Sequence, residues 1–204
     1  MRYDLLLCGV GGQGIITLSE IVATAAISKD LKAIVTQDRG LAQRGGSVKA
    51  HVRMGDVHSP MIPKGHAHAL LSLELWESLS YNDYVNLETV IAVSATVIPG
   101  LWSASSGKKK TPPVPNADPR RMIERIAPRS LIVDGDARVS ELGVPRGTNI
   151  FMLGVIFGMD PRIRDLISAD ELAASIASVV RKKPEENIAI FRAGMECGKA
   201  SESR

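Results

Sequence analysis

The chain has 204 residues, enough for one α/β domain and too few for two of ordinary size. Hydrophobic residues make up 45% and charged residues 23%, a globular composition that excludes a chain disordered throughout. A net charge of +3 is too small for a nucleic-acid binder, and with aromatic residues at only 4% we expect no nucleic-acid partner.

The sequence also argues against a membrane or secreted protein. No apolar run approaches the roughly 20 residues that span a bilayer, and the N-terminal segment lacks the features of a signal peptide. The two cysteines, Cys8 and Cys197, lie near opposite ends of the chain and form neither a disulfide framework nor a CxxC motif. We therefore expect a cytoplasmic protein whose two cysteines are reduced and serve packing.

The first predicted element is a strand at residues 3–8, which is apolar on both faces and so suits a buried strand of a parallel sheet. A glycine-rich loop follows at residues 9–14. From Ile15 the apolar positions recur at helical spacing until residues 28–30, and residues 33–36 are a second strand candidate. This order is typical of the start of a doubly wound sheet, in which the two strands are neighbours.

A stretch of alternating apolar and polar residues predicts the next strand. The apolar positions alternate with polar ones, namely Val48, Ala50, Val52 and Met54 with Lys49, His51 and Arg53. The alternation predicts a strand with one solvated face. Gly55-Asp56 then predicts the turn of an antiparallel hairpin into residues 57–59.

Short apolar runs and helix signals continue to the end of the chain. Strands are expected at residues 69–73, 89–94 and 131–134, with a helix through Leu75 and Leu79. A capping box opens a helix at Ser168, and Pro184 suits the first turn of another. The Lys/Pro-rich residues 103–119 predict an exposed loop within the domain. We expect a single domain over residues 1–204, a Rossmann-like α/β three-layer sandwich with a mainly parallel sheet and an antiparallel hairpin.

The glycine-rich loop is the first candidate site. Gly9, Gly11 and Gly14 fit the GxGxxG fingerprint between a strand and a helix, where backbone N–H groups approach a pyrophosphate. Asp38 follows the second strand, where a carboxylate would bind a ribose. The alternative is that the glycines only allow tight packing of strand against helix, with no ligand.

A second candidate site follows directly. It consists of polar and glycine residues after the second strand, namely Asp38, Arg39, Gln43, Arg44, Gly45, Gly46 and Ser47. Two arginines beside a turn suit anion recognition or a charged subunit contact, and a solvated surface loop is the alternative. Because the loops after the first two strands emerge at the carboxyl edge of a parallel sheet, we expect this segment to meet Gly11, Gly12, Gln13 and Gly14 there.

Other motifs argue against cofactor chemistry in this chain. Gly135-Asp136-Ala137 lacks the second glycine of the thiamine diphosphate motif, and Asn149 follows too soon after it. His66 and His68 form an isolated H-x-H without nearby cysteines or clustered carboxylates, so we expect no metal site.

Several segments together resemble a known family. These are CGVGGQGIITLSEIVATAA, DRGLAQRGGSVKAHVRMGDVHSPMIPKGHAHALL, GTNIFMLG and KPEENIAIFRAGME. They are similar to the gamma-type subunits of 2-oxoacid:ferredoxin oxidoreductases, most closely the small (beta) subunit of the indolepyruvate type. The resemblance covers almost the whole chain, and QRGGSV is its most specific part. The chain departs from the pattern in the loop at 103–119 and in Leu41, where Met is commoner.

The resemblance implies a small subunit of a hetero-oligomer that is inactive alone. A large (alpha) subunit would hold thiamine diphosphate and the iron–sulfur clusters, and the complex would oxidise aryl pyruvates to aryl-acetyl-CoA and reduce ferredoxin. Coenzyme A is then a co-substrate that this chain is in a position to contact. The chain itself carries no cofactor and no known catalytic residue, and its glycine loop and arginine segment would face the large subunit.

Three alternatives stay open at this point. The first is a small subunit for another 2-oxoacid, such as pyruvate, ketoisovalerate or 2-oxoglutarate. The second is a free-standing oxidoreductase that binds NAD(P) or FAD through the glycine loop and Asp38. The third is a non-catalytic module that forms a homodimer.

Overall fold

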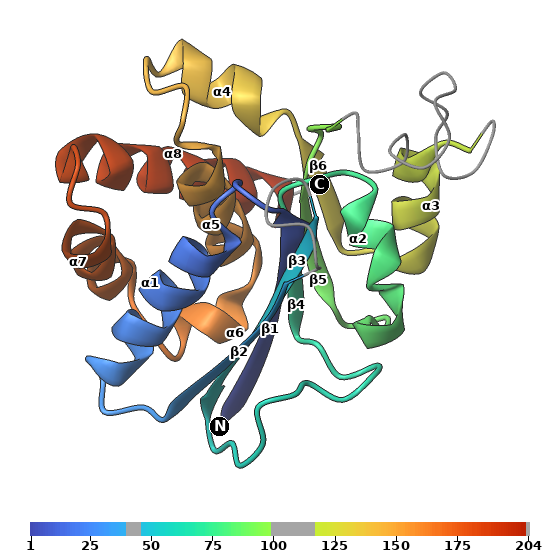
Figure 1. Cartoon of the computed structure of the whole chain (residues 1–204), viewed down its shortest axis with the longest axis horizontal. Coiled ribbons are helices and arrows are strands. Elements are labelled where there is room, and N and C mark those ends of the chain that lie inside the picture. Colours follow the sequence, from blue (N-terminus) through green and yellow to red (C-terminus); the bar gives the residue numbers. More distant parts are fainter. Residues whose placement is uncertain (40–45, 99–116, 203–204) are drawn as a thin grey trace.

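The computed structural model describes residues 1–39, 46–98 and 117–202. All six of the described strands lie in the part of the chain up to Val133, with helices between some of them, and the described elements after that residue are all helices (Figure 1). The elements are β1 (Arg2–Val10), α1 (Ile15–Ile27), β2 (Ala33–Arg39), β3 (Ser47–Gly55), β4 (Ala69–Ser72), α2 (Glu77–Ser80), η1 (Asn82–Tyr84), β5 (Val90–Ser94), α3 (Pro119–Ile126), β6 (Ser130–Val133), α4 (Gly135–Glu141), α5 (Thr148–Met159), α6 (Pro161–Arg164), α7 (Ala169–Val179) and α8 (Pro184–Glu202).

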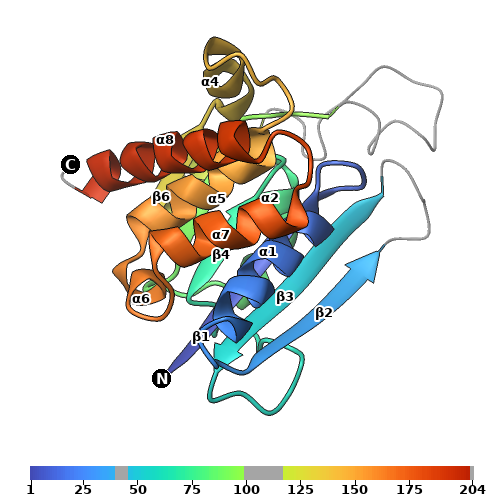
Figure 2. The same cartoon turned by 90° about the vertical axis from the view of Figure 1, so that its left-hand side faces the viewer.

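The sheet has the strand order β2-β3-β1-β4-β5-β6. Strands β1, β4, β5 and β6 are parallel, whereas β3 runs antiparallel to both of its neighbours, β1 and β2. Helices α1, α5, α7 and α8 cover one face, and α2 and α3 cover the other (Figure 1). Figure 2 shows the first group side by side over the sheet. The expected α/β three-layer sandwich with a mainly parallel sheet is confirmed.

The antiparallel pairing lies elsewhere than the sequence predicted. Residues 57–59 form no strand, so the predicted hairpin at Gly55-Asp56 is wrong. Instead β3 pairs with β2 before it and with β1, and Gly55 lies opposite Arg2. Because β3 is inserted between β1 and β2, these two strands are not neighbours, contrary to the doubly wound expectation.

The polar face of β3 is buried, which corrects a second prediction. His51 is 0% and Arg53 4% exposed, although the alternation predicted a solvated face. Arg53 donates to the buried Asp4 carboxylate at 2.6 Å and to the carbonyl oxygens of Ser59 and Met61. The chain after β3 therefore folds back over this face, and hydrogen bonds to the guanidinium hold it there.

Helix α5 runs through the interior of the larger helical layer. All of its residues from Ile150 to Met159 are buried. It is apolar around its whole circumference, so the sequence shows no amphipathic period at this place. Its partner is α8, and glycines at Gly154, Gly158, Gly194 and Gly198 let the two backbones approach closely.

The predicted helix starts in the C-terminal half are confirmed. Ser168 caps α7 with its side chain on the Glu171 N–H, and the Glu171 carboxylate returns to the Ser168 N–H. Pro184 is the first residue of α8. The N-terminal part of the predicted loop at 103–119 lies outside the described residues, and Pro119 already begins α3. Among the described helices, none is both long and apolar enough to cross a membrane.

Candidate functional site

The glycine loop joins β1 to α1 at the carboxyl edge of the sheet. Gly14 is the N-cap of α1 with a φ of 91°, and Gly12 has a φ of 104°, backbone conformations that favour glycine. A Cβ at Gly9 would lie 2.8 Å from Gln13 Oε1. The free N–H groups at the start of α1 make this edge electropositive.

Gln13 anchors the loop with its side chain. Its Oε1 accepts the Val10 N–H at 2.7 Å, and its Nε2 donates to the Leu73 carbonyl at 2.7 Å. The loop is therefore tied to its own strand and to the end of the neighbouring strand β4. This anchoring gives the loop a fixed shape in which only part of its backbone is free to meet a ligand.

The glycine loop meets the start of β3, as expected, but through a different pairing. The Gly11 N–H donates to the Gly46 carbonyl at 2.8 Å, and Ser47 lies opposite Val10 in the antiparallel ladder. Antiparallel pairing places the beginning of β3 beside the end of β1. Gly46 and Ser47 thus join Gly11 at one edge, although β1 and β2 are separated.

A pocket of about 490 Å³ opens over the glycine loop. It is lined by Gly12, Gln13, Gly14, Leu73, Asp136, Arg146, Thr148 and Asn149. Thr148 begins α5, so residues at the N-termini of two helices line one hollow together with Arg146. Such an arrangement suits an anionic group, above all a phosphate.

Among the described residues that line this pocket, Asp136 is the one acidic group, and its carboxylate already accepts two hydrogen bonds. Thr148 donates to one oxygen at 2.6 Å and Thr96 to the other at 2.7 Å. The residue that resembles part of the thiamine diphosphate motif is therefore held in place by two hydroxyl groups. Each carboxylate oxygen keeps a lone pair that is able to accept a hydroxyl group of a bound molecule.

Sequence reasoning missed Arg146 and Thr148 as lining residues. The signal was present, because GTNIFMLG belongs to the segments that carry the family resemblance and contains Thr148 and Asn149. The spacing of Asn149 from Asp136 does not fit the thiamine diphosphate motif, and the Asn149 side chain lies against Gly14.

Two buried carboxyl groups lie between the end of β4 and the start of α2. Glu74 is 0% and Glu77 3% exposed. Burial raises the pKa of both carboxyl groups above the usual 4.5, and for Glu77 the nearby Glu74 adds to the rise. Glu74 accepts the N–H groups of Glu77 and Ile98, whereas Glu77 accepts the Ser47 hydroxyl at 2.6 Å.

The remaining candidates of the second segment lie farther away or outside the described residues. Asp38 forms an ion pair with Lys49 at 3.2 Å on the outer strand pair, two strands away from the glycine loop. Its position is therefore not that of a ribose-binding carboxylate beside the loop. Arg39 ends β2, and its side chain, together with Gln43, Arg44 and Gly45, lies outside what the structure describes.

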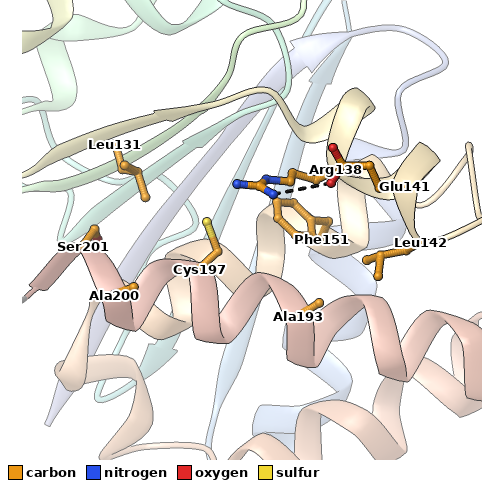
Figure 3. Close-up of a pocket in the computed structure, with 9 residues that line it drawn as sticks. All are labelled: Leu131, Arg138, Glu141, Leu142, Phe151, Ala193, Cys197, Ala200 and Ser201. Atoms are coloured by element: carbon orange, nitrogen blue, oxygen red, sulfur yellow. Dashed lines mark hydrogen bonds and ion pairs between the residues drawn. The ribbon is translucent and has the colours of Figure 1, made fainter.

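A second pocket, of about 470 Å³, lies between α4, α8 and the edge strand β6 (Figure 3). The Cys197 thiol points into it, beside Phe151, and Arg138 forms an ion pair with Glu141 at its rim. None of the described residues that the sequence singled out for the glycine loop or the arginine segment lines it.

The cysteines and histidines of the described residues form no metal centre. Both Cys8 and Cys197 are free thiols. Within the described ranges, no group of three or more His, Cys, Asp or Glu side chains is arranged to hold a metal ion. The Nδ1 atom of His68 accepts the Asp4 N–H at 3.0 Å, so this histidine has a role in the fold.

Comparison with known proteins gives consistent results along the whole chain. The family model described as pyruvate ferredoxin/flavodoxin oxidoreductase matches residues 4–197. An indolepyruvate oxidoreductase subunit IorB from Archaeoglobus fulgidus is 35% identical over 159 residues, which cover 78% of this chain and 77% of the relative. A 2-oxoglutarate synthase subunit KorC from Methanocaldococcus jannaschii is 29% identical over 203 residues, or 98% of this chain and 95% of the relative.

A solved structure has the same fold. The gamma subunit of a keto/oxoacid ferredoxin oxidoreductase from Geobacter sulfurreducens superimposes with a TM-score of 0.68 at 23% identity, over 98% of each chain.

Proposed function

The chain belongs to the pyruvate ferredoxin/flavodoxin oxidoreductase family, and from this membership we propose that it is the small subunit of an indolepyruvate-type 2-oxoacid:ferredoxin oxidoreductase. The complex oxidatively decarboxylates an aryl pyruvate, forms the aryl-acetyl thioester of coenzyme A and transfers the electrons to ferredoxin. The observation that carries the proposal is the 35% identity to an indolepyruvate oxidoreductase subunit over most of both chains.

The cofactors of this reaction belong to a large subunit in our proposal. Two cysteines in 204 residues are too few for the four thiolates that hold an iron–sulfur cluster. Gly135-Asp136-Ala137 lacks the second glycine of the thiamine diphosphate motif, so we place that cofactor in the large subunit as well. The large subunit therefore supplies both, and the small subunit completes the assembly. Free thiols such as those of Cys8 and Cys197 suit the reducing cytoplasm, where we place the complex.

The pocket over the glycine loop is the place where this chain contacts coenzyme A in our proposal. Coenzyme A carries phosphate groups, which the N-termini of α1 and α5 and the Arg146 guanidinium are suited to bind. The lone pairs of Asp136 are available to hydroxyl groups of the same molecule. Gly12, with its positive φ, keeps the loop backbone free of side-chain bulk at this place.

The arginine segment faces the large subunit in the same proposal. Gly46 and Ser47 stand at the carboxyl edge, and the preceding Gln43, Arg44 and Gly45 connect to it through the chain. A guanidinium binds a carboxylate or phosphate in two-pronged fashion, which lysine does not reproduce. Arg44→Ala and Arg44→Lys should therefore fold normally and each lose roughly 2–5 kcal/mol in assembly or turnover.

Co-expression with the large subunit of the same organism tests the assignment. The two chains should co-purify with fixed stoichiometry, and Arg44→Ala should weaken the co-purification. The assignment fails when the wild-type chains do not associate under any salt condition tested. An isolated chain that forms only homodimers would support the interaction-module alternative instead.

A second candidate substrate has an observation in its favour. The 29% identity to a 2-oxoglutarate synthase subunit extends over almost the whole of both chains. Indolepyruvate, pyruvate, ketoisovalerate and 2-oxoglutarate should therefore be assayed side by side on the purified complex. We expect the highest kcat/KM for the aryl pyruvate.

A further inference from the structure

A chain of short hydrogen bonds joins α2 to the start of β3. The Ser47 hydroxyl donates to Glu77 Oε2 at 2.6 Å and lies 2.5 Å from the Tyr81 hydroxyl. Because Ser47 has a single proton to give and gives it to the carboxylate, the Tyr81 hydroxyl is the donor to Ser47. Hydrogen bonds to a carboxylate are stronger than those between neutral groups.

The series of hydrogen bonds extends from Ser47 to the glycine loop through the backbone. Ser47 follows Gly46, whose carbonyl accepts the Gly11 N–H at 2.8 Å. On its other side the loop is anchored by the hydrogen bond from Gln13 Nε2 to the Leu73 carbonyl. Leu73 immediately precedes Glu74, whose carboxylate holds the first turn of α2 through the Glu77 N–H. Both anchors of the loop therefore lead back to the same short helix.

Burial of the Glu74 and Glu77 carboxyl groups is unfavourable for folding unless hydrogen bonds replace the lost hydration. Both lie in the interior, and within the described residues no lysine or arginine nitrogen lies within ion-pair distance of either carboxylate. Lys49 is near, but its ammonium pairs with Asp38 and lies over the rings of Tyr81 and Tyr84. Burying a carboxylate costs free energy, and the hydrogen bonds from the Ser47 hydroxyl and from the N–H groups of Glu77 and Ile98 offset part of that cost.

From this juxtaposition we infer that Glu77 and Ser47 are positioning residues for the pocket at the carboxyl edge, because they fix Gly46 and through it the glycine loop. This inference rests on the proposed function for the identity of the ligand. It goes beyond that function because it assigns a role to α2. This helix supplies no residue that lines the pocket, yet it holds the glycine loop that does.

The test uses the co-purified complex and two variants, each of which removes one partner of the hydrogen bond between Ser47 and Glu77. Ser47→Ala and Glu77→Ala should each raise the KM for coenzyme A about tenfold, the loss expected for a hydrogen bond to a charged group. The KM for the 2-oxoacid should stay unchanged, since that pocket belongs to the large subunit. Ser47→Thr keeps the hydroxyl group and should restore the wild-type KM for coenzyme A.

Ser28→Ala is the matched control, because the Ser28 hydroxyl donates to the Ala25 carbonyl at the far end of α1 from the glycine loop. Hydrogen exchange gives a readout that does not depend on activity. Peptides that contain residues 9–14 should exchange faster in Ser47→Ala than in wild type or Ser28→Ala.

Unchanged exchange in Ser47→Ala overturns the positioning role, whether or not the complex is active. A uniform fall in kcat with unchanged KM for coenzyme A also overturns it, because that result describes loss of folded complex. Failure of the proposed function is a different result: the wild-type complex would then show no coenzyme A-dependent oxidation, while the exchange experiment still decides the inference.

Discussion

A buried ion pair joins Arg53 to Asp4 at the N-terminal edge of β1, where the antiparallel strand β3 ends. Asp4 is 0% exposed, and Arg53 Nε lies 2.6 Å from its carboxylate. Arg53→Met should cost about 3–5 kcal/mol in the free energy of unfolding, because it leaves a buried charge without its main partner. Urea unfolding measures this cost.

The exposed pair of Arg138 and Glu141 provides the control, with both side chains more than half exposed. Arg138→Met should change the free energy of unfolding by no more than about 0.5 kcal/mol. The double variant Arg53→Met with Asp4→Leu should recover part of the loss. Equal costs for Arg53→Met and Arg138→Met would contradict this account of the N-terminal edge.

The two cysteines should differ in reactivity. Burial raises the pKa of Cys8 to about 12, whereas Cys197 is half-buried and its thiol points into the pocket beside α4 (Figure 3). A thiol reagent should therefore label one equivalent in the folded protein and two in urea. Cys197→Ser should abolish labelling of the folded protein, and labelling of Cys8 before unfolding would be inconsistent with the structure.

Among the elements, the pair α5 and α8 depends most on the absence of side chains. A Cβ at Gly154 would overlap the Phe191 carbonyl oxygen, and one at Gly198 would overlap that of Val155. The two helices would have to separate to admit a methyl group. Gly154→Ala should therefore cost about 2 kcal/mol or more despite the better helix propensity of alanine.

Ser178→Ala on the exposed face of α7 is the matched control and should stay within about 0.5 kcal/mol of wild type. Thermal unfolding followed by circular dichroism compares the two variants. A Gly154→Ala protein as stable as the control would mean that the helices are not in backbone contact.

The strands and most helices of this chain follow from local sequence patterns, but their arrangement does not. The apolar runs of β1, β4 and β5 and the capping box at Ser168 are local signals, and the structure has the predicted elements there. The insertion of β3 between β1 and β2 depends on contacts between residues far apart in sequence. The turn predicted at Gly55 does end a strand, but the chain then leaves the sheet and forms no second strand of a hairpin.

The burial of polar residues in β3 is another feature that the sequence pattern did not predict. The alternation in β3 reads as a solvated face, but Arg53 and His51 are covered by an irregular segment that has no apolar period of its own. For the site, the glycines and Ser47 were evident because glycine loops are local motifs. Arg146 was not evident, because it belongs to no local motif. It lines the pocket because the connection between α4 and α5 folds back to the glycine loop.

At the scale of the whole molecule, the buried His51 and the half-buried His68 make the fold sensitive to acid. Burial lowers the pKa of His51 and of His68 below the usual 6.5, and the Nδ1 atom of each accepts a backbone N–H. The unfolded chain therefore binds more protons than the native chain below that pH. The stabilisation is complete above pH 6.5 and is lost as the pH falls towards the lower native pKa values.

Glu77 contributes with the opposite sign. Its native pKa is raised above 4.5, so its contribution favours the folded state at low pH and is lost as the pH rises through the native pKa. Glu77→Gln should thus gain stability relative to wild type as the pH rises from about 4.5. Urea unfolding at a series of pH values tests both signs. A constant difference between Glu77→Gln and wild type would show that Glu77 does not titrate differently on folding.

The proposed function rests on the whole complex and is tested there most directly. The measurement is the rate of ferredoxin reduction with indolepyruvate and coenzyme A, for the complex and for the large subunit alone. The account predicts that reduction requires this chain and coenzyme A, and that Arg146→Ala raises the KM for coenzyme A about tenfold, the cost of one lost hydrogen bond to a charged group. A large subunit that is fully active without this chain, or a complex indifferent to coenzyme A, would contradict it.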